Sequence, residues 1–255
     1  MSEYTLTRKP KDGRRYYEVT ENTTGNIIGL YPSITTVLGE TSDKSGLADW
    51  RKKVGEEEAD RISTLSMNRG TIMHRLIELY KPIQGTPEEA LEKLKVIASD
   101  DIEVNEFVEN VSGALFLEEG WKMFMKFWYN HSRYFSRIDE VVEAETFLWS
   151  TKGGGYAGTV DNISKFKDGR ILIVDYKNSR KPKRVDWIQD YFIQGAAYWV
   201  AYWERSGIKP DGVEIWIANE VQDMPQTFSL SNDDVKYYFR QFQERLKTFK
   251  EKFDI

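Results

Sequence analysis

The segment Ile171–Asn178 constrains this chain most, because it ends an apolar run with two charged residues. Its sequence is ILIVDYKN, and the four aliphatic residues predict a strand that is buried on both faces. Alternate residues of a strand share a face, so Asp175 and Lys177 point the same way. An isolated buried charge costs several kcal/mol unless it is paired or binds a metal ion. The pair is therefore a candidate for a functional site.

The turn before this strand decides which acidic side chains meet. It contains Lys167–Gly169 and follows a strand that carries Asp161. A two-residue turn would put Asp161 and Asp175 on opposite faces, whereas a three-residue loop with a left-handed Gly169 pairs them directly. The glycine in the third position favours the longer loop. Asp161, Asp175 and Lys177 then lie on one face, and carboxylates that face each other favour a bound Mg²⁺ or Mn²⁺ ion.

Residue periodicity divides the chain into three parts of what we expect to be a single domain. Residues 1–40 have the pattern of a β-hairpin region, 41–136 are mostly helical and 137–255 alternate between strand and helix patterns. The expected strands of the first part cover 14–20 and 27–38. Strands and helices in this order predict an α/β or α+β core, with a mixed sheet and helices on its faces.

The helices of the middle part are expected to include residues 47–62 and 67–80. Thr86 and Glu89 have the spacing of a capping box, which predicts that another helix begins there. Asp186 is the candidate N-cap of a later helix. The elements expected in the last part are strands at 141–149, 156–166, 170–177 and 212–219, and helices at 186–204 and 231–253.

Composition excludes several kinds of site. The 255 residues contain no cysteine, which excludes disulfides, thiolate zinc sites and iron–sulfur clusters. No run approaches the roughly 18 apolar residues of a membrane helix, and MSEYTLTRKP does not have the pattern of a signal peptide. We therefore expect no membrane association and a cytoplasmic location, in a bacterium or a phage-infected cell. The net charge of -5 argues against a basic surface overall but permits a local basic stripe.

Four groups of residues resemble the motifs of one nuclease family. GTVD at 158–161, followed after 13 residues by DYK at 175–177, resembles the core of the PD-(D/E)XK nuclease superfamily. RGTIMHRLIE at 69–78 resembles the histidine-bearing helix of its RecB-type branch, and QGAAY at 194–198 resembles the Gln-x-x-x-Tyr motif that follows. YPSITTVL with GLADWRKKVGEEEAD, within residues 31–60, is similar to phage exonucleases and the mitochondrial genome maintenance exonuclease. Together the motifs cover about residues 31–205.

The resemblance implies a restriction-endonuclease-like fold and hydrolysis of phosphodiester bonds with one or two Mg²⁺ or Mn²⁺ ions. Asp161, Asp175 and the main-chain carbonyl of Tyr176 would bind the metal, and His74 would complete its ligands. Lys177 would orient or deprotonate the attacking water, with a pKa lowered by a nearby cation or by desolvation.

Further residues are implied at lower specificity. Glu145 is favoured as an additional metal ligand ahead of Glu143 and Glu78. Asn178 follows the lysine where the family often has threonine. The residues implied to support the site or contact nucleic acid are Ser33, Arg69, Ser179, Arg180, Lys181, Gln194 and Tyr198. Exposed aromatic residues could in addition stack on the bases of a single strand.

Plainer interpretations remain open for the same residues. Asp161 and Asp175 could be solvated strand carboxylates, and His74 could be a surface histidine bonded to Glu78. Gln194 and Tyr198 could be ordinary residues at the edge of the core.

The function that the motifs favour is a metal-dependent DNA exonuclease. Its expected substrate is DNA that is single-stranded or has free ends, in phage or bacterial recombination, repair or replication, and the expected oligomeric state is a monomer. The alternatives are a structure-specific or restriction-type endonuclease and a catalytically silent nucleic-acid-binding module.

Overall fold

The computed structural model describes residues 3–80, 85–110 and 114–254, and two sheets organise them. The first sheet is antiparallel and contains β1 (Tyr4–Lys11), β2 (Arg14–Glu21) and β3 (Ile27–Pro32). The second has five strands in the order β4-β5-β6-β7-β8, with β6 and β7 parallel and the other neighbours antiparallel. Its strands are β4 (Ile138–Ser150), β5 (Tyr156–Phe166), β6 (Ile171–Ser179), β7 (Gly212–Asn219) and β8 (Gln226–Leu230).

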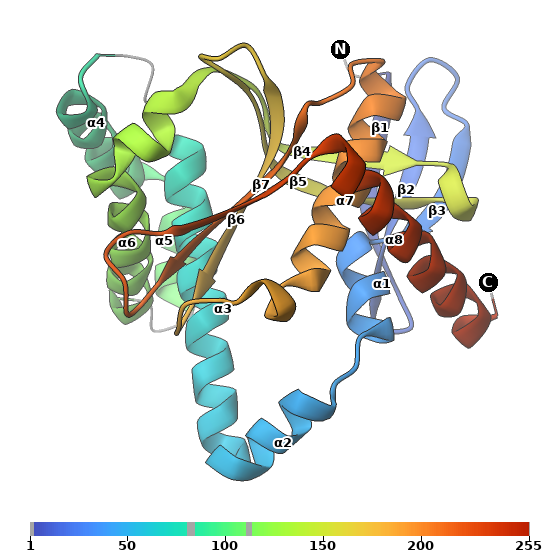
Figure 1. Cartoon of the computed structure of the whole chain (residues 1–255), viewed down its shortest axis with the longest axis horizontal. Helices are drawn as coiled ribbons and strands as arrows, with labels where there is room; N and C mark the ends of the chain where they lie inside the picture. Colours follow the sequence, from blue (N-terminus) through green and yellow to red (C-terminus); the bar gives the residue numbers. More distant parts are fainter. Residues whose placement is uncertain (1–2, 81–84, 111–113, 255) are drawn as a thin grey trace.

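Helices cover both faces of the five-stranded sheet, so the expected mixed α/β fold is confirmed (Figure 1). One face packs against α3 (Glu56–Leu79) and α6 (Ala114–Tyr129), with α4 (Pro87–Asp100) and α5 (Ile102–Asn110) outside them. The other packs against α1 (Ile34–Thr41), α7 (Gln189–Ser206) and α8 (Asn232–Phe253). Each face therefore has its own apolar core. None of the helices among the described residues is long and apolar enough to cross a membrane.

The core of the sheet shows the alternation that two buried faces require. Leu172 and Val174 of β6 pack in the core on the α3 side, whereas Ile173 packs in the core on the α7 side. Asp175 and Lys177 have the same parity as Ile173, which places them toward α7. The strand thus carries its two charges on one face, as the sequence predicts.

The N-terminal region differs from its prediction. Residues 27–38 are not one strand, because β3 ends at Pro32 and α1 begins at Ile34. Ser33 is the N-cap, its side chain accepting a hydrogen bond from the Thr36 amide, and this capping redirects the chain into a helix. The hairpin also gains a third strand, β1, so the region is a three-stranded sheet.

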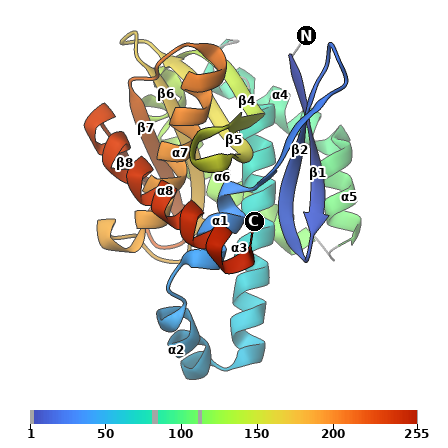
Figure 2. The ribbon, with the colours of Figure 1, turned by 90° about the vertical axis from the view of Figure 1, so that its right-hand side faces the viewer.

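The predicted helix over 47–62 is two helices. The break lies at Gly55, whose φ of 89° belongs to the region that favours glycine, and it separates α2 (Ser45–Val54) from α3. α2 buries no residue and stands away from the rest of the molecule at the end of α3 (Figures 1 and 2). The break therefore gives the molecule a projecting helical arm.

Two details of the C-terminal part also differ from the prediction. Asp186 does not cap α7, because it lies in a short 3-10 turn, η4 (Val185–Trp187), where it accepts a hydrogen bond from Arg184, and α7 begins at Gln189. The edge strand β8 was not predicted. The Thr86–Glu89 capping box is confirmed, while part of the preceding segment lies outside the described residues.

Candidate active site

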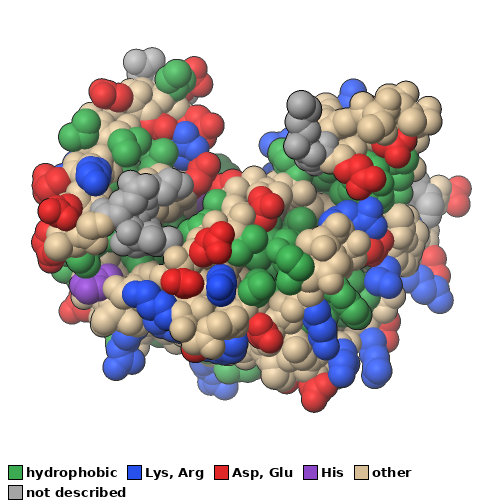
Figure 3. Space-filling model, turned by 90° about the horizontal axis from the view of Figure 1, so that it is seen from above, with side chains coloured by type: hydrophobic (Ala, Val, Ile, Leu, Met, Phe, Trp, Pro, Cys, Tyr) green, Lys and Arg blue, Asp and Glu red, His purple; other side chains and the backbone are tan. Residues whose placement is uncertain are grey.

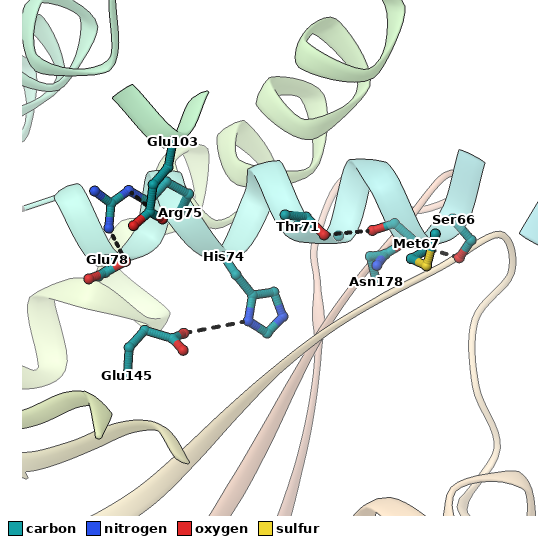
Figure 4. Close-up of a pocket in the computed structure, with 10 residues that line it drawn as sticks. Ser66, Met67, Thr71, His74, Arg75, Glu78, Glu103, Glu145 and Asn178 are labelled. Atoms are coloured by element: carbon teal, nitrogen blue, oxygen red, sulfur yellow. Dashed lines mark hydrogen bonds and ion pairs between the residues drawn. The ribbon is translucent and has the colours of Figure 1, made fainter. Parts of the chain in front are cut away.

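Three side chains from three different elements meet beside the sheet. His74 of α3, Glu145 of β4 and Asp161 of β5 each present a ligand atom, and these atoms lie within 4.8 Å of one another. His74 Nδ1 is 3.9 Å from Glu145 Oε1 and 3.6 Å from Asp161 Oδ2. Figure 4 shows the His74 ring directed from α3 toward Glu145. Glu78, one turn along α3, pairs with Arg75 instead, at 2.6 Å. His74 is thus directed toward the acidic cluster.

The backbone at Glu145 is strained in a way that serves this geometry. Its φ of 46° is in the left-handed region, in the interior of a strand. A residue that is not glycine costs about 1–3 kcal/mol there and keeps that conformation only when its surroundings enforce it. The neighbours Ala144 and Thr146 stay paired with β5 on either side. The left-handed conformation is therefore confined to Glu145, whose side chain joins the cluster. Of the candidate acids Glu145, Glu143 and Glu78, Glu145 is the best placed to bind a metal ion. Glu143 instead accepts a hydrogen bond from Thr146.

The hairpin has the predicted three-residue loop. The Phe166 amide donates to the Arg170 carbonyl at 2.8 Å, and Gly169 has a φ of 89°. In this register Asp161 would lie opposite Asp175, but the ladder ends one pair earlier, at Asn162 and Val174. Asp161 instead accepts a hydrogen bond from the main-chain amide of Tyr176, at 2.8 Å from Oδ2. Two facing carboxylates repel each other, so the strands separate where the acidic residues begin.

Asp175 is outside the three-residue group and forms an ion pair with Lys177. Its side chain is buried, with 1% of the residue exposed. Burial raises the pKa of Asp175 to about 6, and the charge of Asp161 adds to that rise while Lys177 opposes it. The charge of Asp161 therefore reaches Asp175, which places the two carboxylates in the same electrostatic environment.

Lys177 is more firmly cationic than the sequence suggested. Desolvation lowers the pKa of Lys177, but the charges of Asp175 and Asp161 outweigh it, so that the net shift is upward. Desolvation therefore acts in the expected direction but is outweighed by the two carboxylates, and a lowered pKa would require the charge of a bound cation. Lys177 Nζ also lies 5.3 Å from the ring centroid of Tyr191, in a cation–π contact from α7. In the absence of a bound ion, the side chain of Lys177 is thus held as a cation between Asp175 and Tyr191.

The electrostatics at His74 also favour a cation. Burial lowers the pKa of His74, whereas Asp161 and Glu145 raise it, and the net shift is upward. The site therefore stabilises positive charge beside two carboxylates. A cavity of about 20 Å³ adjoins His74, Glu145 and Asp161, which is room for one ion or one water. The two carboxylate oxygens are ligands for Mg²⁺ or Mn²⁺, and the imidazole nitrogen is a ligand for a transition metal, so the residues present fit a divalent ion.

A groove of about 550 Å³ runs along α3 beside this cluster (Figure 4). The residues that line it are Ser66, Met67, Gly70, Thr71, His74, Arg75, Glu78, Glu103, Glu145 and Asn178. Asn178 follows the candidate catalytic lysine directly, so the groove connects the His74 cluster with the end of β6. It offers space for part of a substrate strand next to the metal ligands.

Arg69 and Asn178 join α3 to the end of β6. The side chain of Arg69 is 0% exposed. Its Nε donates to Asn178 Oδ1 at 2.6 Å, and its Nη1 forms an ion pair with Glu220, which follows β7. A Cβ at Gly70 would lie 2.5 Å from Asn178 Nδ2, so glycine permits this close approach. Arg69 therefore supports the site and has no surface for nucleic acid. The role of Asn178 was not predicted, although its departure from the usual threonine was the available signal.

Gln194, Tyr198, Ser33 and Ser179 are buried. Gln194 Nε2 donates to the Tyr198 hydroxyl at 3.4 Å, and Ser179 donates to the Lys181 carbonyl at 2.8 Å. These residues can support the site but offer no contact surface to a strand. Arg180 and Lys181 are exposed and remain available to phosphate groups.

Replacing Asp175 by asparagine is expected to stabilise the metal-free protein at neutral pH. The folded pKa of about 6 lies above the ordinary aspartate value of 3.8, so the folded state holds this proton more tightly and loses stability as pH rises from about 4 to about 6. The gain in the free energy of unfolding for Asp175→Asn should be about 2–3 kcal/mol at pH 7.5 and small near pH 4. Urea denaturation in EDTA at both values measures it. A gain that does not change with pH would contradict the assignment.

Comparison with known proteins gives one family and a few structural likenesses. A family model described as the PD-(D/E)XK nuclease superfamily matches residues 42–254. No curated protein sequence matches the chain. Among solved structures, a protein from Eubacterium rectale that is provisionally described as an exonuclease is 12% identical, with a TM-score of 0.46 over 68% of this chain and 78% of that one. The protein SSO0001 is also 12% identical, with a TM-score of 0.34 over 61% and 70% of the two chains.

Proposed function

Because the chain belongs to the PD-(D/E)XK nuclease superfamily, we propose that it is a Mg²⁺- or Mn²⁺-dependent DNA exonuclease formed by a single domain. The observation that carries this proposal is the meeting of His74, Glu145 and Asp161 within 4.8 Å, next to the Asp175–Lys177 pair. Ordinary surface carboxylates do not explain a strained Glu145, a buried Asp175 and a histidine directed toward two acids. The cluster explains all three as parts of one site.

The residues of this chain have distinct tasks in the proposed reaction. A bound divalent ion would activate the attacking water and the phosphoryl oxygen. His74, Glu145 and Asp161 would hold the ion, with Asp175 and the Tyr176 carbonyl as further ligands inferred from the family resemblance. The Tyr176 amide fixes the Asp161 carboxylate. Lys177, kept cationic by Asp175, would orient the water and stabilise negative charge that develops on the phosphoryl group.

The exonuclease mode is supported by the arm that α2 forms at the end of α3 (Figures 1 and 2). The arm is joined through Gly55 to α3, the helix that carries His74, and three basic residues, Arg51–Lys53, lie in the last turn of α2. Arg51 is occupied by Glu56 and Asp60, whereas Lys52 and Lys53 form no salt bridge among the residues that the structure describes. Basic residues on this arm would add phosphate contacts that guide a strand toward α3.

A comparison of linear and covalently closed DNA tests this mode. With Mg²⁺ or Mn²⁺, the protein should degrade linear DNA, and single strands labelled at one end should be shortened from one terminus, with no reaction in EDTA. Closed circles should survive the same treatment. Equal cutting of circles would favour an endonuclease, and a protein that binds DNA without cleaving it would be a silent binding module.

A further inference from the structure

We propose that Trp187 is a stacking platform for an unpaired base, so that the strand presented to Lys177 is single-stranded. This inference rests on the proposed function and specifies its substrate. Trp187 lies in the η4 turn between β6 and α7, and 60% of the residue is exposed. The indole therefore presents a large flat aromatic face to solvent in the segment that follows the candidate catalytic strand.

The turn is held close to the candidate catalytic lysine. Tyr191, which contacts Lys177 at 5.3 Å, lies four residues after Trp187, about one helical turn along the same segment. The loop before the turn is anchored to β8, because the Lys183 amide donates to Gln226 Oε1 at 2.7 Å and Gln226 Nε2 donates to the Lys183 carbonyl at 2.9 Å. Trp187 therefore lies between two fixed points, the Lys183–Gln226 hydrogen bonds before it and Tyr191 of α7 after it, rather than on a free loop.

The charges around Trp187 match a nucleic-acid backbone. The five residues Arg180–Arg184 contain four cations, of which Lys183 is half-buried and the others are exposed. The Arg184 guanidinium lies 5.5 Å from the Trp187 ring centroid and also pairs with Asp186 at 3.0 Å. By contrast, acidic side chains are spread over the lobe that α4–α6 form (Figure 3). In a chain with a net charge of -5, this loop is a local site for phosphates.

The loop also lies near the projecting arm. Hydrogen bonds from Arg61, together with the charge of Arg180, lower the pKa of Glu58 on α3, so Arg180 is within electrostatic reach of the start of that helix. A strand bound at this loop would meet cations and an exposed indole in the segment that directly follows Lys177 and Asn178. Stacking on an aromatic face requires a base that is not already stacked in a duplex, which gives the preference for single strands.

Binding without catalysis tests the platform. The full-length protein in EDTA is titrated into fluorescein-labelled oligo(dT), into a duplex of equal length and into an oligomer with an abasic tract, with anisotropy as the readout. Trp187→Ala should weaken binding to oligo(dT) about tenfold, the effect of one stacked base, and should leave the duplex and the abasic oligomer nearly unchanged. Trp187→Phe should retain most of the affinity. The matched control is Trp203→Ala, another exposed tryptophan (44%) further along α7.

Two outcomes would overturn the platform. One is that Trp187→Ala binds oligo(dT) as tightly as Trp203→Ala and the parent. The other is that Trp187→Ala loses affinity by the same factor for all three ligands. This would indicate a general backbone contact or a folding defect, and circular dichroism of the variant separates these two causes. A protein that binds through Trp187 but cleaves nothing contradicts the proposed nuclease function and leaves the platform intact.

Discussion

Lys177→Ala is expected to lower the single-turnover cleavage rate of end-labelled single-stranded DNA by about 10²–10³-fold, the usual loss when one charge-stabilising donor is removed. The raised pKa of Lys177 keeps it cationic, so its main contribution is to stabilise negative charge on the phosphoryl group. Metal and DNA binding should change little, because the three clustered ligands remain. Rates measured at saturating protein and Mn²⁺ separate the chemical step from binding.

The control for this variant is Lys165→Ala, which removes a half-exposed lysine from the neighbouring strand β5. It should cleave at the parental rate. Lys177→Arg should recover only part of the activity, because its larger planar head group does not fit between Asp175 and Tyr191 in the same way. If Lys177→Ala cleaved as fast as the parent, the proposed site would be wrong.

Arg69→Met is expected to lower the free energy of unfolding by about 2 kcal/mol, since a hydrogen bond to a charged group contributes about 1.5–3 kcal/mol and the Asn178 oxygen loses this donor. Methionine restores part of the volume, and the partly exposed Glu220 can be solvated. The Arg69 side chain is completely buried, and its hydrogen bond to Asn178 and ion pair with Glu220 connect α3 to the ends of β6 and β7. Because His74 and Lys177 lie on the two elements that this contact joins, activity should fall as well.

Urea denaturation measures the loss, with Arg61→Met as the matched control on the same helix. Arg61 is exposed and paired with Glu58, so its replacement should change the free energy of unfolding by less than about 0.5 kcal/mol. Equal stability of the two variants would mean that Arg69 does not connect the helix to the sheet.

The sequence allowed the sheet and most of its site to be predicted from local rules. The apolar run 171–174, the glycine at 169 and the alternation of strand faces sufficed for the hairpin and its loop. The histidine helix required the resemblance, because nothing in the periodicity of α3 places His74 against β5. The start of α1 at Ile34 was not predicted, although a local signal for it was present. That signal was a serine N-cap, Ser33, followed by apolar residues at helical spacing.

Other features depend on tertiary structure and could not be predicted. The left-handed backbone of Glu145 arises from the pairing of β4 with β5, which no window of sequence contains. The direction of the pKa shift of Lys177 depends on burial and on the charges of Asp175 and Asp161 together. Desolvation alone would lower this pKa, whereas the net shift is upward. The exposure of Trp187 follows from where α7 begins, two residues later than the Asp186 cap would have placed it.

Titration calorimetry with Mn²⁺ in the absence of DNA tests the central arrangement most directly. The parent should bind Mn²⁺, and Asp161→Asn and Glu145→Gln should each bind at least about tenfold more weakly, since even loss of a residue that only hydrogen-bonds a ligand commonly costs 10–100-fold. Glu143→Gln, on the same strand but outside the cluster, should bind like the parent. Undiminished affinity in both Asp161→Asn and Glu145→Gln would show that these side chains do not hold the ion.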